Sequence, residues 1–348
     1  MRAKPKSPIL FAVLAAVCYG ISAPASKLLL RGLQPAQMAA LLYLGAGLGM
    51  AVVNLCNRKQ NQQEAKITKR ELPYTLGMIA LDIAAPILLM LGLTMTTPAN
   101  ASLLNNFEIV ATSLIALLVF KEAIGKRLWA ALGFIMASSM ILSFENLSSF
   151  SFSYGSLLVL AACLCWGIEN NCTRMLSLKN PLQIVIVKGL GSGAGSLLIA
   201  LTFNEFSMNA LYIFFALLLG FFAYGLSIFF YIKAQRELGA ARTSAYYAIA
   251  PFVGAALSFV VFRQPLTPAF VTAFALMVAG AYLAAFEKHR HFHLHEALEH
   301  EHRHNHGDDH HTHIHSTKIA EEHSHAHSHE GLGHEHEHTP DLHHTHAH

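Results

Sequence analysis

Apolar residues fall into ten windows of about 20 residues each, separated by short polar gaps. A helix of about 20 apolar residues crosses a bilayer core of roughly 30 Å. The pattern therefore predicts an all-α polytopic membrane protein with ten transmembrane helices and a polar tail. The windows cover residues 8–30, 35–56, 72–94, 98–120, 127–145, 154–176, 181–203, 210–232, 240–262 and 267–286.

The composition supports a membrane protein and excludes a soluble chain of this length. Hydrophobic residues make up 53% of the 348 residues and charged residues only 13%, and the mean hydropathy is +0.41. We find no nucleophile paired with a base and no phosphate-binding loop in the sequence. It therefore predicts a protein that is not an enzyme and that requires no cofactor.

Lysine and arginine are distributed unevenly over the polar gaps, which predicts the orientation in the membrane. With a cytoplasmic N-terminus, 16 of them lie on the cytoplasmic side, and only Arg31 and Arg263 lie outside. We expect a multi-pass protein of the cytoplasmic (inner) membrane with both termini in the cytoplasm. Topology accounts for the basic residues, so we expect no nucleic-acid partner. The run after MRAKPK has no small-residue cleavage site and is interpreted as a retained first span.

The first five windows recur, weakly but in order, in the last five. CYGISAPASK (Cys18–Lys27) matches CWGIENNCTR (Cys165–Arg174), and LLVFKE at the end of window four matches FVVFRQ at the end of window nine. Five is odd, so the second copy enters the membrane from the opposite side, which predicts two inverted five-helix repeats. The expected domains are residues 1–145, residues 146–287 and a tail at 288–348. Between the first two matches, Pro35, Gln37, Gly45, Gly47 and Gly49 correspond to Pro181, Gln183, Gly191, Gly193 and Gly195.

The order of these motifs resembles the drug/metabolite transporter superfamily, EamA type, over residues 8–286. The shared features are an aromatic–glycine pair in the first span of each half, a basic residue seven positions later, and FKE after the fourth span. The resemblance implies a carrier of small organic solutes, often an exporter, with a cavity between its halves. Two positions depart from it: Ile109 follows Glu108 where such proteins often have proline, and Gln264 replaces the counterpart of Glu122.

Window six carries polar groups that are costly in a bilayer. Glu169, Asn170 and Asn171 are consecutive, and Glu169 lies at the same depth as Lys188 of the next, antiparallel span. We expect an ion pair between Glu169 and Lys188, with the two asparagines as hydrogen-bonding neighbours. This pair could line a substrate or proton pathway, or it could only lock two helices together.

A second group of polar residues lies in the first half. Asp82 and Glu108 are near the middle of consecutive spans, with Asn105 and Asn106 just before Glu108. No basic residue of that half lies at their depth, so we expect the two acids to share a proton. The pair could couple transport to protons or bind a substrate amine, or it could be a hydrogen bond between helices.

The tail at residues 288–348 has a different composition from the membrane body. It holds all 23 histidines and carries 11 acidic against 4 basic residues, so we expect it to be disordered. Alternating imidazoles suit Zn, Ni, Co or Cu ions at many weak sites; a pH-sensitive polyelectrolyte is the alternative. The expected metal ligands are His291, His293, His295, His302, His304, His306, His311, His313, His315, His323, His325, His327, His329, His334, His336 and His338.

Two functions are compatible with this sequence. The first is a secondary transporter in the lipid bilayer, an exporter of a small organic metabolite that could be coupled to protons, with a metal-binding regulatory or buffering tail. The second is a transporter of divalent Zn, Ni or Co ions whose tail collects the ion. The membrane body contains no histidine, which favours the first. The sequence does not indicate an oligomeric state.

Overall fold

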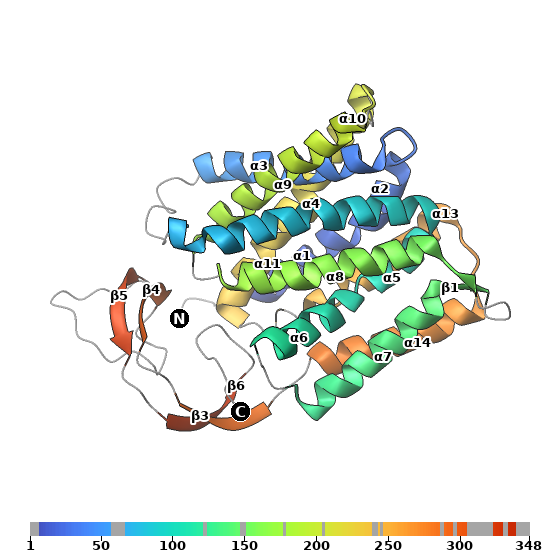
Figure 1. Cartoon of the computed structure of the whole chain (residues 1–348). Helices are drawn as coiled ribbons and strands as arrows, with labels where there is room; N and C mark the ends of the chain where they lie inside the picture. The colour runs from blue at the N-terminus through green and yellow to red at the C-terminus, as the bar shows by residue number, and fades with distance from the viewer. Residues whose placement is uncertain are drawn as a thin grey trace.

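The membrane body is a bundle of helices, shown in Figure 1 as a computed structural model. The structure describes residues 7–56, 67–120, 124–146, 151–176, 179–203, 206–238, 243, 246–285, 289–294, 298–304, 323–329 and 333–338. The helices of the first half are α1 (Ser7–Gly20), α2 (Ser22–Leu29), α3 (Pro35–Cys56), the short η2 (Lys69–Glu71), α4 (Leu72–Met95), α5 (Pro98–Leu104), α6 (Phe107–Phe120) and α7 (Lys126–Ser143). Those of the second half are α8 (Tyr154–Arg174), α9 (Pro181–Thr202), α10 (Ala210–Gly220), η3 (Phe221–Leu226), α11 (Ser227–Leu238), α13 (Ala250–Phe262) and α14 (Pro268–Ala285).

The ten predicted windows all contain helix. Within the described residues, eight helical segments are long and apolar enough to cross a membrane. The fifth window is helix α7, which starts with Lys126 and Arg127 and is therefore less apolar over its 18 residues. The ninth contains α13, a shorter apolar helix of 13 residues. Several spans begin as their sequences predict, with proline in the first turn of α4, α5 and α9 and an asparagine cap before α9 and α10.

The two halves pack against each other as an inverted pair. Helix α3 lies along α9, so the second spans of the two halves are in contact with each other, as are the fifth spans α7 and α14 (Figure 1). The third span of the first half, α4, packs on α8, the first span of the second half; reciprocally, α11 packs on α1. This exchange of partners is the pattern that a two-fold axis in the membrane plane produces.

Glycines allow the close crossing of α3 and α9. A Cβ atom added to Gly47 would lie 2.6 Å from the backbone nitrogen of Leu190, and one added to Gly193 would lie 2.7 Å from that of Leu44. These two contacts are each other's equivalents in the repeat. Small residues therefore let the backbones touch at the centre of the bundle, as is common where membrane helices cross.

Three of the described spans depart from regular α-helix near their middles. The first has a turn at Ile21 between α1 and α2, across which helical hydrogen bonds continue, and the fourth has a turn at Asn105 and Asn106 between α5 and α6. The eighth contains the π-helical turn η3. Such departures in membrane helices occur where the backbone borders a cavity, and π turns occur often at functional sites.

Two short antiparallel ribbons form in the tail. Strand β3 (His289–Leu294) pairs with β6 (Gly333–His338), and β4 (Leu298–His304) pairs with β5 (His323–His329). A further pair, β1 (Phe144–Asn146) and β2 (Ser151–Phe152), joins the two halves. We predicted no regular structure for the tail; the alternation of histidine with other residues has the period of two that strands share, which accounts for the pairing.

Candidate functional site

A cavity of about 510 Å³ lies between the two halves of the bundle. Its lining comes from α1, α3, α6, α8, α9, η3 and α11, and from Tyr247 just before α13. It reaches from Tyr43, in the middle of α3, to Thr173 and Pro181 at the connection between α8 and α9. The predicted topology assigns that connection to the cytoplasm. The cavity is thus a chamber between the repeats that extends toward one membrane face.

Lys188 is held between two carboxylates at one wall of the cavity. Its Nζ lies 3.0 Å from Oε1 of Glu169 and 3.0 Å from Oδ2 of Asp82. Thr173 also donates a hydrogen bond to Glu169, and the Tyr43 hydroxyl donates to Oδ1 of Asp82 at 2.8 Å. The two carboxylates are almost inaccessible to solvent, and the Lys188 side chain is 14% exposed. The predicted ion pair between Glu169 and Lys188 is therefore present, and Asp82 extends it into a triad.

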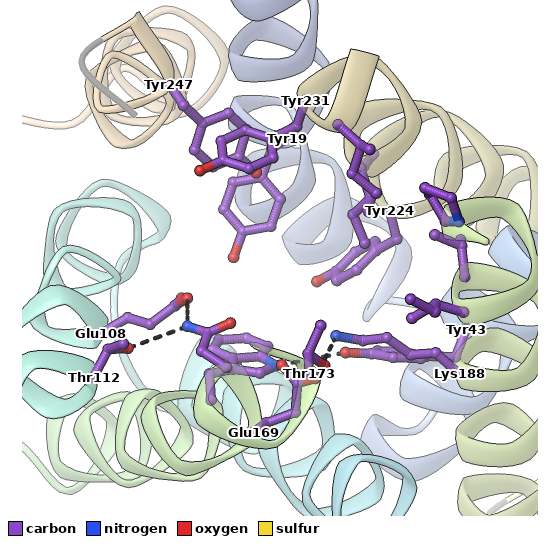
Figure 2. Close-up of a pocket in the computed structure, with 18 residues that line it drawn as sticks. Tyr19, Tyr43, Glu108, Thr112, Glu169, Thr173, Lys188, Tyr224, Tyr231 and Tyr247 are labelled. Carbon is purple, nitrogen blue, oxygen red and sulfur yellow. Dashed lines mark hydrogen bonds and ion pairs between the residues drawn. The ribbon is translucent and has the colours of Figure 1, made fainter. Parts of the chain in front are cut away.

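The predicted pair of Asp82 and Glu108 is wrong. Asp82 turns to Lys188, a residue of the other half, because α4 packs on α8 and α9. Glu108 instead accepts a hydrogen bond of 2.6 Å from Nδ2 of Asn170, which also donates to the Thr112 hydroxyl at 3.2 Å (Figure 2). The two acids thus belong to separate clusters, and the expectation of one proton shared between them is withdrawn.

The turn between α5 and α6 in the fourth span determines the position of Glu108. Helix α6 starts at Phe107, so Glu108 lies in the first turn, where the helix dipole favours a negative charge. The predicted neighbours Asn105 and Asn106 lie in this turn and do not line the cavity. Oδ1 of Asn105 and Nδ2 of Asn106 are buried without a hydrogen-bond partner among the described residues. They contribute to the irregular backbone rather than to the cavity wall.

The two asparagines of α8 have different roles. Asn170 lines the cavity beside Glu108. Asn171 points its amide to the backbone carbonyls of Gly167 and Thr112, at 2.8 and 3.3 Å, and so ties α8 to α6. Of the eight residues predicted for the pathway, four line the cavity: Glu108, Glu169, Asn170 and Lys188. Asp82 is not part of the lining but forms an ion pair with Lys188.

Aromatic residues form the part of the wall that sequence reasoning missed. Figure 2 shows Tyr19, Tyr231 and Tyr247 across the cavity from Glu108 and Glu169. Neighbouring rings are in contact: the centroids of Tyr231 and Tyr247 are 5.0 Å apart, and those of Tyr43 and Tyr224 are 5.4 Å apart. The available signal was the position of these tyrosines within spans, because tyrosine usually gathers at the membrane interfaces. The wall also includes Trp166, Thr112 and Thr173.

Two glutamines join the halves at opposite ends of the bundle. Gln37, fully buried at the start of α3, donates to the carbonyl of Ser207 at 2.7 Å and accepts from its amide at 2.8 Å. Its counterpart Gln183, at the start of α9, accepts from the amide of Ile67 at 3.0 Å. Because α3 and α9 are antiparallel, the Gln37 contact lies at the end away from Pro181. That end is where the α9–α10 connection is held against α3.

No metal-binding cluster of three or more histidine, cysteine or acidic side chains occurs among the residues that the structure describes. The histidines predicted as metal ligands all belong to residues 291–338, whose side chains lie outside the described part. For the tail, the structure therefore gives the pairing of the strands and no ligand geometry.

Comparison with known proteins gives a consistent result. The model of the EamA-like transporter family matches residues 6–144 and again residues 153–286. An uncharacterized transporter of Methanothermobacter thermautotrophicus is 26% identical over 272 residues, which cover 73% of this chain and 78% of that protein. The uncharacterized transporter YyaM of Bacillus subtilis is 23% identical over 57% of this chain and 68% of its own length. A solved crystal structure shares the fold with a TM-score of 0.58 at 18% identity, covering 81% of this chain and 96% of the other.

Proposed function

This chain belongs to the EamA-like transporter family, and we propose that it is a secondary carrier that exports a small organic metabolite through the cavity between its halves. The observation that carries the proposal is the chamber of about 510 Å³, whose wall contains Glu108, Glu169 and Lys188 in the interior of a membrane bundle. Charged groups at that depth are costly and are typical of solute and ion pathways. The volume is in the usual range of small-molecule sites.

The direction in which the cavity extends agrees with the proposed export. It reaches the α8–α9 connection, which the distribution of basic residues assigns to the cytoplasm, while Gln37 and Ser207 hold the other end together. A chamber that loads from the cytoplasm is what an exporter requires. The inverted repeat supplies the alternative state, because exchanging the conformations of the two halves opens the opposite end.

A blocking substitution tests whether the cavity is the pathway. Ile228 lines the cavity, whereas Val260, on a helix of the same half, is 75% exposed on the outer surface of the bundle. In proteoliposomes loaded with a metabolite mixture, the Ile228→Trp variant should lose solute release, while Val260→Trp should retain it. Equal release by both variants would exclude the cavity as the pathway.

Proton coupling is proposed at Glu108 alone. Its carboxylate lines the cavity and is held by an amide, so it can bind a proton without breaking an ion pair. Asp82 and Glu169, in contrast, both form ion pairs with Lys188. Glu108→Gln should abolish the acceleration of export by an inward proton gradient while leaving the protein in the membrane. Gradient-driven export that persists in this variant would contradict the assignment.

The tail is proposed as a metal-responsive regulator. Its strand register sets histidine opposite histidine, as in His291 with His336 and His302 with His325, and directly opposite positions have Cβ atoms about 4.5–5.5 Å apart. Imidazole binds metal in its neutral form, so Zn or Ni binding should weaken steeply below about pH 6. Deleting residues 288–348 should leave solute export intact and remove its response to metal. If the deletion instead abolished transport of a metal ion, the ion-carrier function would replace this one.

A further inference from the structure

The cavity has more acidic than basic groups, and the excess is concentrated at Glu108. Among the described residues, three carboxylates, Asp82, Glu108 and Glu169, accompany a single lysine, Lys188. Nζ of Lys188 forms ion pairs with Oδ2 of Asp82 and Oε1 of Glu169, at 3.0 Å each, so two carboxylates already compensate its charge. No basic side chain of the described residues forms an ion pair with Glu108. An anion entering the cavity would therefore have to break the triad, whereas a cation would meet a carboxylate that is held by an amide and forms no ion pair with a described residue.

The wall opposite Glu108 is suited to the same kind of ligand. Tyrosine rings follow one another from Tyr231 through Tyr247 and Tyr19 to Tyr224, with centroid separations of 5.0, 5.9 and 5.9 Å. Figure 2 shows them on the far side of the cavity from Glu108. Aromatic faces attract ammonium groups and also bury apolar surface. A solute placed between the two walls would have its charge at a carboxylate and its body against rings.

Resting on the carrier function proposed above, we infer that the cavity selects an organic cation: a compact solute with a protonated amine, an apolar body and no carboxylate. The ammonium group donates to Glu108, which Asn170 holds in place while also donating to the Thr112 hydroxyl. The apolar body lies against the tyrosines. The absence of a carboxylate follows from Lys188, because a zwitterion would need a second, cationic site and the one lysine of the lining is engaged.

Four probes of matched shape test the class of ligand on the purified full-length protein by isothermal titration calorimetry. They are 2-phenylethylamine (cation), 2-phenylethanol (neutral), 3-phenylpropionate (anion) and phenylalanine (zwitterion). The amine should bind roughly 10 to 100 times more tightly than the alcohol, because a charged hydrogen bond is worth about 1.5–3 kcal/mol. The anion and the zwitterion should bind more weakly than the amine. Equal or tighter binding of either would overturn the inference, and this series needs no variant.

Substitutions assign the binding to the two walls. Glu108→Gln should weaken amine binding roughly 10- to 100-fold and leave the binding of the alcohol unchanged. Tyr247→Phe, which keeps the ring, should bind the amine normally, whereas Tyr247→Leu, which loses the ring contact with the apolar body, should bind it about 2- to 10-fold more weakly. Glu71→Gln removes an acid that pairs with Lys179 outside the cavity and serves as the matched control. Amine binding that survives Glu108→Gln would contradict the site.

The failure of this inference can be told apart from the failure of the carrier function. If phenylalanine or 3-phenylpropionate binds best while Ile228→Trp still blocks export, the ligand class is wrong and the carrier stands. If the amine binds in a Glu108-dependent way but Ile228→Trp leaves export unchanged, the site is correct and the cavity is not the pathway.

Discussion

Two interfaces between the halves are related by the inverted repeat, and they differ completely in chemistry. At one, Lys188 is bound by Asp82 and Glu169. At the other, the equivalent of Lys188 is Leu42 and that of Glu169 is Ser22. The equivalent of Asp82 follows from the glycine contacts. Gly191 lies against Ile79, and its counterpart Gly45 lies against Leu217, so Leu217 is the equivalent of Ile79. Three residues after Ile79 is Asp82, and three residues after Leu217 is Gly220, which is therefore its equivalent.

The uncharged interface is closed by backbone packing. A Cβ atom on Gly220 would collide with the backbone of Leu42, and Ser22 donates a hydrogen bond of 3.2 Å to the hydroxyl of Tyr224. The two halves therefore pack in the same way with and without charges. The comparison teaches that small residues supply the symmetry of the fold, while the ionic triad is an addition to one of the two interfaces, where it borders the cavity.

The largest expected effect comes from breaking the triad. Lys188→Leu leaves two buried carboxylates without their cation, and it should destabilise the protein by about 3–5 kcal/mol and stop transport. Replacing the whole triad by its counterparts, with Lys188→Leu, Asp82→Gly and Glu169→Ser together, should recover most of the free energy of unfolding but not transport. Thermal unfolding in detergent and export from liposomes measure the two properties. A triple variant as unstable as the single one would mean that the charges are part of the fold.

The glycine crossing should respond symmetrically and less strongly. Gly47→Ala and Gly193→Ala each force a Cβ atom to within 2.7 Å or less of a backbone nitrogen of the partner helix. Both should lower the free energy of unfolding by about 1–3 kcal/mol, to the same extent. Gly133 is the control, since an added Cβ there meets no heavy atom within 4 Å. Gly133→Ala should be stabilising by about 0.5–1 kcal/mol, and clearly unequal losses at the crossing would contradict the symmetry.

The smallest effect is expected at the two glutamines. Gln37→Ala removes two hydrogen bonds to Ser207, whereas Gln183→Ala removes one from Ile67. Each bond contributes about 0.5–1.5 kcal/mol, so Gln37→Ala should be the more destabilising of the two. With cysteine introduced by Ser207→Cys, membrane-impermeant labelling from outside should increase in Gln37→Ala and not in Gln183→Ala. Labelling of Ser207→Cys only from the cytoplasmic side would reverse the assignment of the membrane faces, and an equal increase in both variants would contradict the local role of Gln37.

Much of the fold follows from patterns that are local in the sequence. The length of the apolar windows predicts the spans, the odd number of spans in each repeat predicts the inversion, and the glycines of windows two and seven predict a close crossing. The pair of Glu169 and Lys188 was also predictable, because consecutive antiparallel spans are neighbours and depth can be counted along each of them. Tyr43 and Tyr224, in contrast, carried only a weak signal, their position within spans, since an aromatic residue there is usually only part of the packing.

The tertiary structure decided which charges meet. Depth along the membrane normal is a property of the sequence, and by depth alone Asp82 could reach Glu108. Which helix a side chain faces depends on how the spans are arranged around the bundle, and that arrangement arises from contacts between halves that are distant in the chain. Packing of α4 on α8 and α9 turned Asp82 to Lys188, and the turn between α5 and α6 left Glu108 at the cavity with Asn170.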